Sequence, residues 1–180
     1  MEILTCERPK RIIKNRKKLE EKLGIKITGK GNEITIRGSA ENEYIAKKVI
    51  DALEFGFPFS VALLIKEQDF MFEAMNIKDH TKRKDLEKIR ARIIGKQGKT
   101  LRALLELTKC HFEIKDNLVG IVGEPEYMRI ATEAMMYLIH GAKHANVYSF
   151  LEKHHIKPVI DLGLKPVKKT KKKNRKIDKF

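Results

Sequence analysis

Cysteine is scarce in this sequence of 180 residues, where Cys6 and Cys110 are the only two. Because they form no CxxC pair, the sequence indicates neither a disulfide framework nor a cysteine-based zinc site. Long apolar runs are also missing, since no stretch approaches the roughly 18–20 residues that span a bilayer. The start, "MEILTCERPK", lacks the apolar core of a secretory signal. These absences predict a cytoplasmic protein without a membrane segment.

Acidic residues are outnumbered, with 24 Asp and Glu against 39 Lys and Arg, and the formal net charge is +15. Residues 165–180 hold nine basic residues and one acid, so about +8 lies there and about +7 in residues 1–164. This excess favours a polyanionic partner, either nucleic acid or an anionic membrane surface. The hydrophobic residues, 42% of the chain, suffice for one medium domain or two small ones.

An internal repeat organises the chain. A shift of 85 residues aligns residues 19–56 with residues 104–141 without a gap. In both copies alternating apolar residues predict a β-hairpin, joined by "GKGN" in the first copy and by "DN" in the second. An amphipathic helical pattern precedes and follows each hairpin, and Pro125 suits the first turn of the last of these helices.

Further elements are predicted outside the repeat. A strand before each copy completes the unit, at "EILTC" (2–6) and at "FMFEAMNI" (70–77). Between the copies, residues 58–69 predict a connecting helix, and "TKRKDLEKIRARI" (81–93) predicts a basic helix. The segment "AKHANVYSFLEKHH" after the second copy predicts one more helix. The pattern favours two α+β domains of similar fold.

The glycine loop from Gly95 to Gly98 lies between the helix predicted at 81–93 and the next one. It runs into Lys-Thr like a nucleotide-binding P-loop, but the P-loop pattern requires a glycine where this chain has Ile93. A P-loop also follows a buried strand, whereas the preceding "KDLEKIRARI" is charged and helical in pattern. The order helix, GxxG, helix, hairpin, helix is that of a KH domain, whose loop clamps about four nucleotides of a single strand.

The loop and its neighbours form the candidate binding site. Glycines let the backbone approach phosphates closely, and the helix that follows adds free N–H groups and a positive dipole end. We expect phosphates to be held by the loop and by nearby side chains: Gly95, Lys96, Gln97, Gly98, Lys99, Arg102, Arg90 and Arg92. We expect unstacked bases to lie against an apolar wall of Ile94, Phe112 and Ile114, with Leu101 or Leu105. For each apolar residue, burial in the core is the competing interpretation.

The first copy lacks this loop. The same shift places Lys10 opposite Gly95 and Ile13 opposite Gly98. A basic run in this copy fits either phosphate contact or a solvated helix face, and it consists of Lys10, Arg11, Lys14, Arg16, Lys17 and Lys18. We therefore expect the first copy to be mainly structural or a surface for a partner.

The motifs together resemble a known family. The two units, the second reading "RIIGKQGKT" and followed by "HGAKHANVYSFLEKH" and a basic tail, resemble the archaeal members of the partner-of-Nob family of ribosome-assembly proteins. The resemblance covers nearly the whole chain up to the tail, and the two motifs in combination are more specific than GxxG alone. It implies tandem type I KH-like domains, each a three-stranded sheet with helices on one face.

Family resemblance also implies a function. Such a protein is a non-enzymatic assembly factor that binds the single-stranded 3′ region of small-subunit (16S-type) ribosomal RNA beside the Nob endonuclease or other assembly factors. The rival hypothesis is a protein-interaction scaffold, in which the KH units are docking platforms and RNA binding is non-specific.

Repeat and resemblance together predict the domain organisation. The parts are a degenerate KH-like domain without GxxG (1–56), a linker helix (57–69), a KH domain with the GxxG loop (70–142), a C-terminal helix (143–157) and a basic flexible tail (158–180).

No catalytic or cofactor motif stands out in the sequence. His140 and His144 are spaced four apart, but no acid or cysteine accompanies them at the spacing of a closed zinc site. We expect no enzyme activity, metal, cofactor or small-molecule substrate.

Overall fold

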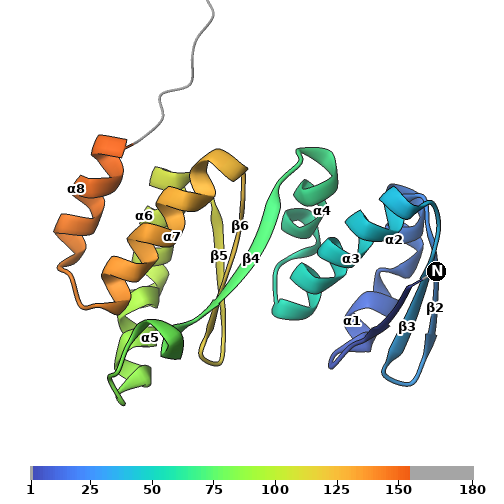
Figure 1. The fold of residues 1–180 in the computed structure, drawn as a ribbon, viewed down its shortest axis with the longest axis horizontal. Helices are drawn as coiled ribbons and strands as arrows, with labels where there is room; N and C mark the ends of the chain where they lie inside the picture. Colours follow the sequence, from blue (N-terminus) through green and yellow to red (C-terminus); the bar gives the residue numbers. More distant parts are fainter. Residues whose placement is uncertain (1, 155–180) are drawn as a thin grey trace, which may run out of the picture.

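A computed structural model describes residues 2–154 and contains two antiparallel three-stranded sheets, ordered β1-β3-β2 and β4-β6-β5. Each half follows the order strand, helix, helix, strand, strand, helix. The halves are stacked so that the helices of the first half lie between the two sheets (Figure 1). The predicted α+β class is therefore confirmed. None of the helices among the described residues has the length and apolar character needed to cross a membrane.

The first half is built around the hairpin that the sequence predicts. Ile27, Ile34 and Ile36 alternate along it and are fully buried beneath the helices. Ser39 begins the last helix by accepting a hydrogen bond from the Asn42 N–H. The elements are β1 (Glu2–Thr5), α1 (Pro9–Lys14), α2 (Arg16–Leu23), β2 (Lys26–Lys30), β3 (Glu33–Arg37) and α3 (Ala40–Phe55).

The second half repeats this connectivity. Its hairpin turns at Asp116, which adopts a positive φ of 54°, and Pro125 occupies the first turn of the last helix. The elements are β4 (Met71–Asn76), η1 (Ile77–His80), α5 (Leu86–Ile94), η2 (Lys96–Gly98), α6 (Lys99–Thr108), β5 (His111–Lys115), β6 (Leu118–Gly123) and α7 (Pro125–Ile139).

Two of the helices in residues 2–154 lie outside the repeat. Helix α4 (Phe59–Glu67) connects the halves, and α8 (His144–His154) packs on α6 and α7 (Figure 1). Val147 and Leu151, which share one side of α8, are each 1% exposed. The end of the helix predicted to reach residue 157, and the tail predicted at 158–180, lie outside the described residues.

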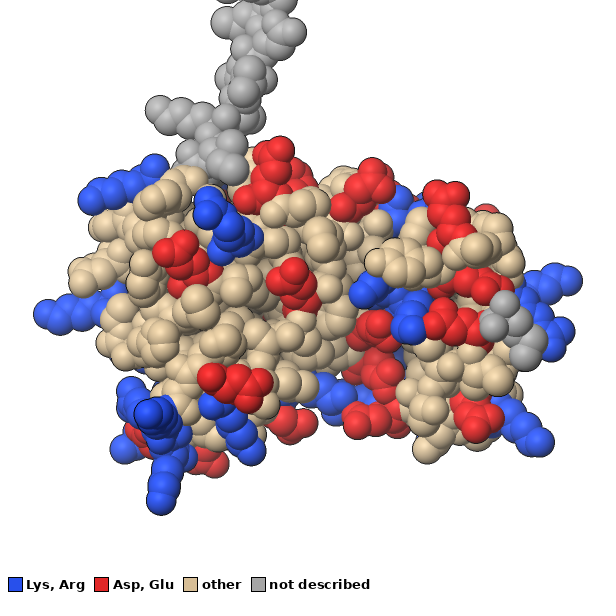
Figure 2. All heavy atoms as spheres, in the orientation of Figure 1, with Lys and Arg blue, Asp and Glu red and all other residues tan. Residues whose placement is uncertain are grey.

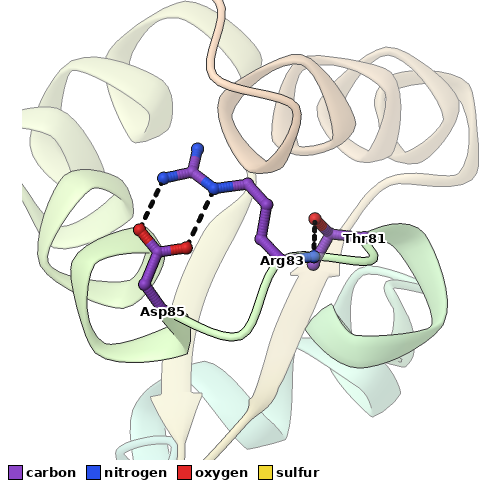
Figure 3. Close-up of polar contacts among 3 residues, drawn as sticks. All are labelled: Thr81, Arg83 and Asp85. Atoms are coloured by element: carbon purple, nitrogen blue, oxygen red, sulfur yellow. Dashed lines mark hydrogen bonds and ion pairs between the residues drawn. The ribbon is translucent and has the colours of Figure 1, made fainter.

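The predicted helix at 81–93 was placed too early, because α5 begins only at Leu86. Thr81 Oγ1 accepts a hydrogen bond from the Arg83 N–H at 3.2 Å. The Arg83 guanidinium binds both carboxylate oxygens of Asp85, at 3.0 and 2.7 Å (Figure 3). Such short-range bonds to side chains compete with helix formation, so the basic segment forms a turn before the helix starts.

The two halves share apolar packing. The rings of Phe55 and Phe57 lie 5.9 Å apart, and each lies 5.7–5.9 Å from the ring of Phe72 in β4 of the second sheet. A Cβ atom at Gly120 in β6 would lie 2.6 Å from the Phe55 ring. Only glycine therefore lets the end of α3 approach β6 this closely.

Candidate nucleic-acid interface

The loop from Gly95 to Gly98 joins α5 to α6 in a conformation that depends on its glycines. Gly95, Gln97 and Gly98 have positive φ angles of 72°, 55° and 74°. A Cβ atom at Gly95 would lie 2.1 Å from Oγ1 of the buried Thr100, so no other residue fits there without displacing Thr100. Gly98 has open space around its Cα, and its constraint is the backbone angle alone.

The side chains around the loop leave its outer surface open. Lys96, Gln97 and Lys99 are exposed. Arg102 reaches back from α6, and its Nη2 donates to the Gln97 carbonyl oxygen at 2.6 Å. Helix α6 begins at Lys99 without a side-chain cap, so its positive dipole end lies at the loop. This arrangement suits a phosphate.

Beside the loop is a hollow of about 220 Å³. One wall of the hollow is formed by α6, through Leu101, Arg102 and Leu105. A second wall is formed by β5, through Phe112. The structure thus brings three of the residues expected in the apolar wall together next to Arg102, which contacts the loop. Ile94 is 38% exposed beside the loop, and Ile114 packs against the core of the second half. Neither of these two lines the hollow.

The third wall was missed in the sequence. It comes from the connection between the halves, through Phe57, Pro58 and Val61. No periodicity links this segment to the loop, because the contact arises from the packing of one half on the other. In the sequence of this segment, a fixed turn is indicated only by Pro58, which follows Phe57.

The two arginines of α5 make contacts within the protein. Arg90 Nη1 donates to the Asp116 carbonyl oxygen at 3.0 Å, which fastens the β5–β6 turn to α5. Arg92 donates to the Ala142 carbonyl oxygen. The carbonyl oxygen of Arg92 lies 3.0 Å from Nε2 of His144. Both arginines therefore stabilise the fold around the loop, and His144 is explained by the docking of α8.

The first half has no counterpart of the loop, and the ungapped alignment fails at this point. Lys10 and Ile13, expected opposite the two glycines, both lie inside α1. The junction of α1 with α2 is the single residue Asn15, with φ −101°. Arg11, a member of the basic run, donates instead to the carbonyl oxygens of Gly56 and Phe57 at 2.8 and 3.0 Å.

The competing site types do not fit the geometry. A helix precedes the glycine loop, where a P-loop requires a strand. Residues 2–154 contain no group of three or more His, Cys, Asp or Glu placed to hold a metal ion.

Lys and Arg gather at the lower left of the molecule, at the end where α5 lies (Figure 2).

Comparison with protein families gives a match in the second half. A family model of the eukaryotic-type KH domain (KH-domain type I), the second KH domain of PNO1, matches residues 71–156. The match contains the loop, both helices beside it, the hairpin and α8.

Curated relatives extend the similarity into the first half. A KH domain-containing protein of Methanocaldococcus jannaschii is 32% identical over 149 residues, which cover 79% of this chain and 66% of that protein. The RNA-binding protein pno1 of Drosophila melanogaster is 28% identical over 138 residues, covering 72% of this chain and 58% of that protein. The chain thus spans 66% or less of the length of these two relatives.

Solved structures show the same fold. Dim2p from Pyrococcus horikoshii matches with a TM-score of 0.76 at 25% identity, covering 84% of this chain and 98% of that chain. A complex of Dim2p with a/eIF2α and rRNA from the same organism gives a TM-score of 0.77 at 24% identity, with 86% and 93% covered. The resemblance seen in the sequence motifs is confirmed.

Proposed function

The chain belongs to the KH-domain family of the PNO1 and archaeal Dim2 proteins, and from this membership we propose that it is an RNA-binding ribosome-assembly factor. Its proposed ligand is the single-stranded 3′ region of small-subunit ribosomal RNA, held without catalysis. We place it in the cytoplasm beside a Nob-type endonuclease or other assembly factors. Support comes from relatives described as RNA-binding and as pre-rRNA-processing proteins, and from a fold neighbour solved with rRNA.

The observation that carries this proposal is the geometry of the loop. Its backbone has positive φ angles at Gly95, Gln97 and Gly98. The Arg102 guanidinium donates to its Gln97 carbonyl oxygen, and Lys96 and Lys99 are exposed to solvent. A single strand can lay its phosphates on this surface while its bases turn into the adjacent hollow. The loop residues with Lys99 and Arg102 are the proposed RNA contacts.

The halves are proposed to differ in their roles. Residues 70–142 form the RNA-binding KH domain, and residues 1–56 form a degenerate KH-like domain that supports it through the linker at 57–69. Arg11 fits the supporting role, because its guanidinium binds the carbonyl oxygens of Gly56 and Phe57 rather than facing solvent.

A charge reversal at the loop tests the proposal. Replacing Lys96 and Gln97 together by Asp puts two negative charges at the phosphate site and keeps both glycines. We expect affinity for single-stranded oligonucleotides from the 3′ end of small-subunit rRNA to fall by about tenfold or more. Fluorescence anisotropy measures the affinity, and circular dichroism checks that the variant is folded.

The matched control is the pair Lys17→Asp and Lys18→Asp, at exposed positions of α2 in the half without a GxxG loop. It makes a comparable change in charge and is expected to lower affinity much less. Equal losses in both variants would support the rival scaffold hypothesis, in which RNA binds the basic surface non-specifically. Unchanged binding in a folded loop variant would rule out the proposed site.

A further inference from the structure

The hollow beside the loop is lined by parts of both halves. Leu101 and Leu105 face it from α6, Phe112 from β5, and Pro58 and Val61 from the connection between the halves. Its volume of about 220 Å³ is below the ~300–1,000 Å³ of pockets that hold drug-sized ligands. A space of this size, apolar on several sides and next to a phosphate-binding loop, suits one unstacked planar base.

The wall from the connection is held firmly in place. Arg11 binds two successive carbonyl oxygens of the connection, those of Gly56 and Phe57. Phe57 is 1% exposed, and its ring packs against Phe55 and Phe72. Pro58 follows with its own φ fixed by its ring. A base that enters the hollow therefore meets a wall already set in position.

One acidic side chain faces this hollow. Glu113 of β5 lines it together with His111 and Arg102, and its Cγ lies 3.2 Å from the position that a Cβ at Gly56 would take. The side chain is half-buried. Among residues 2–154 its carboxylate has no ion-pair or hydrogen-bond partner. A carboxylate repels phosphate, so a strand bound here turns a base, and not its backbone, towards Glu113.

From this arrangement we propose that the hollow is a base pocket completed by the first half, in which Glu113 selects a base that carries an exocyclic amino group. Carboxylates accept hydrogen bonds from such amino groups, as from N4 of cytosine. Cytosine, adenine and guanine have one, whereas uracil has none, and its N3–H lies between two carbonyl oxygens that a carboxylate repels. This inference rests on the proposed RNA function and adds a sequence preference to it.

The test uses the full chain and a series of short single-stranded RNA probes. Oligocytidine of four to six nucleotides is compared with versions that carry uracil at one position at a time, by fluorescence anisotropy. We expect one position at which uracil lowers the affinity by about three- to tenfold, the size of one hydrogen bond. Glu113→Gln is expected to reduce this discrimination to less than about twofold, since its amide both donates and accepts.

The control variant is Glu126→Gln, at an exposed position in the first turn of α7, which is expected to keep the parent's discrimination. Equal affinity of the parent chain for cytosine and uracil at every position overturns the base pocket, whether or not Glu113→Gln folds. Unchanged discrimination in folded Glu113→Gln also overturns it. The Lys96→Asp, Gln97→Asp variant tests the proposed RNA function separately, and loss of its binding to all probes supports that function. If this variant still binds the probes, the result counts against the RNA function itself rather than against the pocket alone.

Discussion

Gly95 and Gly98 have different physical reasons for being glycine. Both have a positive φ, which costs a residue with a Cβ atom about 1–2 kcal/mol. Gly95 has a further restriction, because Thr100 occupies the space that its Cβ would need, whereas Gly98 is surrounded by open space. The two glycines of the GxxG motif are therefore not equivalent in this protein.

Substitution by alanine is expected to separate these effects. Gly98→Ala should lower the free energy of unfolding by about 1–2 kcal/mol, the cost of the backbone angle. Gly95→Ala should lower it by about 2–4 kcal/mol, because displacement of Thr100 adds to that cost. Urea unfolding measures both values. Equal destabilisation of the two variants would contradict the role assigned to Thr100.

His111, which lines the hollow, provides a pH-dependent test. Burial lowers the pKa of its imidazole below the ordinary 6.5 in the folded chain. Between that lowered pKa and 6.5 the unfolded chain binds more protons, so the free energy of unfolding falls as the pH falls through this window. His111→Gln should flatten the pH dependence there. Above about pH 8 the curves of parent and variant should run parallel, and a difference in slope in that range would point to another group.

At the scale of elements, the contact of α1 with the end of α3 is the one that shapes the candidate site. Arg11 donates to the carbonyl oxygens of Gly56 and Phe57 while its side chain is partly buried. These carbonyls directly follow the C-terminus of α3, where a positive charge also interacts favourably with the helix dipole. The connection that follows then takes a fixed path towards the hollow.

Arg11→Met is expected to keep the apolar stem and remove the guanidinium. The two charged hydrogen bonds should be lost, and the free energy of unfolding should fall by about 1.5–3 kcal/mol. Lys14→Met, at an exposed position of the same helix, is the control and should change it by less than about 0.5 kcal/mol. A comparable loss in both variants, measured by urea unfolding, would show that only general charge matters.

Elements with a regular apolar pattern were predictable from the sequence, and those set by individual side chains were not. Alternation along β3 of the first hairpin and the periodicity of α8 follow directly from which face is buried, whereas β6 of the second hairpin is buried on both faces. The start of α5 was misplaced, because the Arg83–Asp85 pair holds a turn that helix periodicity does not show. The internal contacts of Arg90 and Arg92 were missed for a related reason, since a basic residue on a helix has the same pattern whether it binds phosphate or a carbonyl group.

The candidate site was predictable where it is local. The GxxG loop and the start of α6 are adjacent in sequence, so their geometry follows from residue type and order. The wall formed by Pro58 and Val61 comes from a segment that precedes the loop by more than thirty residues in sequence. Only the packing of the first half on the second sheet brings it there.

At the scale of the whole molecule, basic charge outside the loop is expected to add affinity without selectivity. Residues 165–180, which carry nine basic residues and one acid, lie outside the described part of the chain. Their deletion should weaken binding to all RNA sequences alike. A plot of log affinity against log salt concentration should also have a shallower slope for the shortened chain. We expect the slope to change by about 0.7 for each phosphate of a single strand that the shortened chain no longer neutralises. Anisotropy titrations at several salt concentrations measure the slope, and weaker binding to one sequence alone would contradict a purely electrostatic role.

The contact of Gly120 with the Phe55 ring has a consequence for how the molecule unfolds. If either half opened alone, it would leave the rings of Phe55, Phe57 and Phe72 in water, at a cost of about 1.5–3 kcal/mol for each fully exposed ring. The halves are therefore expected to melt as one cooperative unit, with a single calorimetric transition whose calorimetric and van't Hoff enthalpies agree. Two resolved transitions would show that the halves are thermodynamically independent. If the molecule melts in a single transition, a destabilising change anywhere in the first half also lowers the stability of the second half, where the proposed RNA site lies. This holds even when the change touches neither the loop nor the hollow.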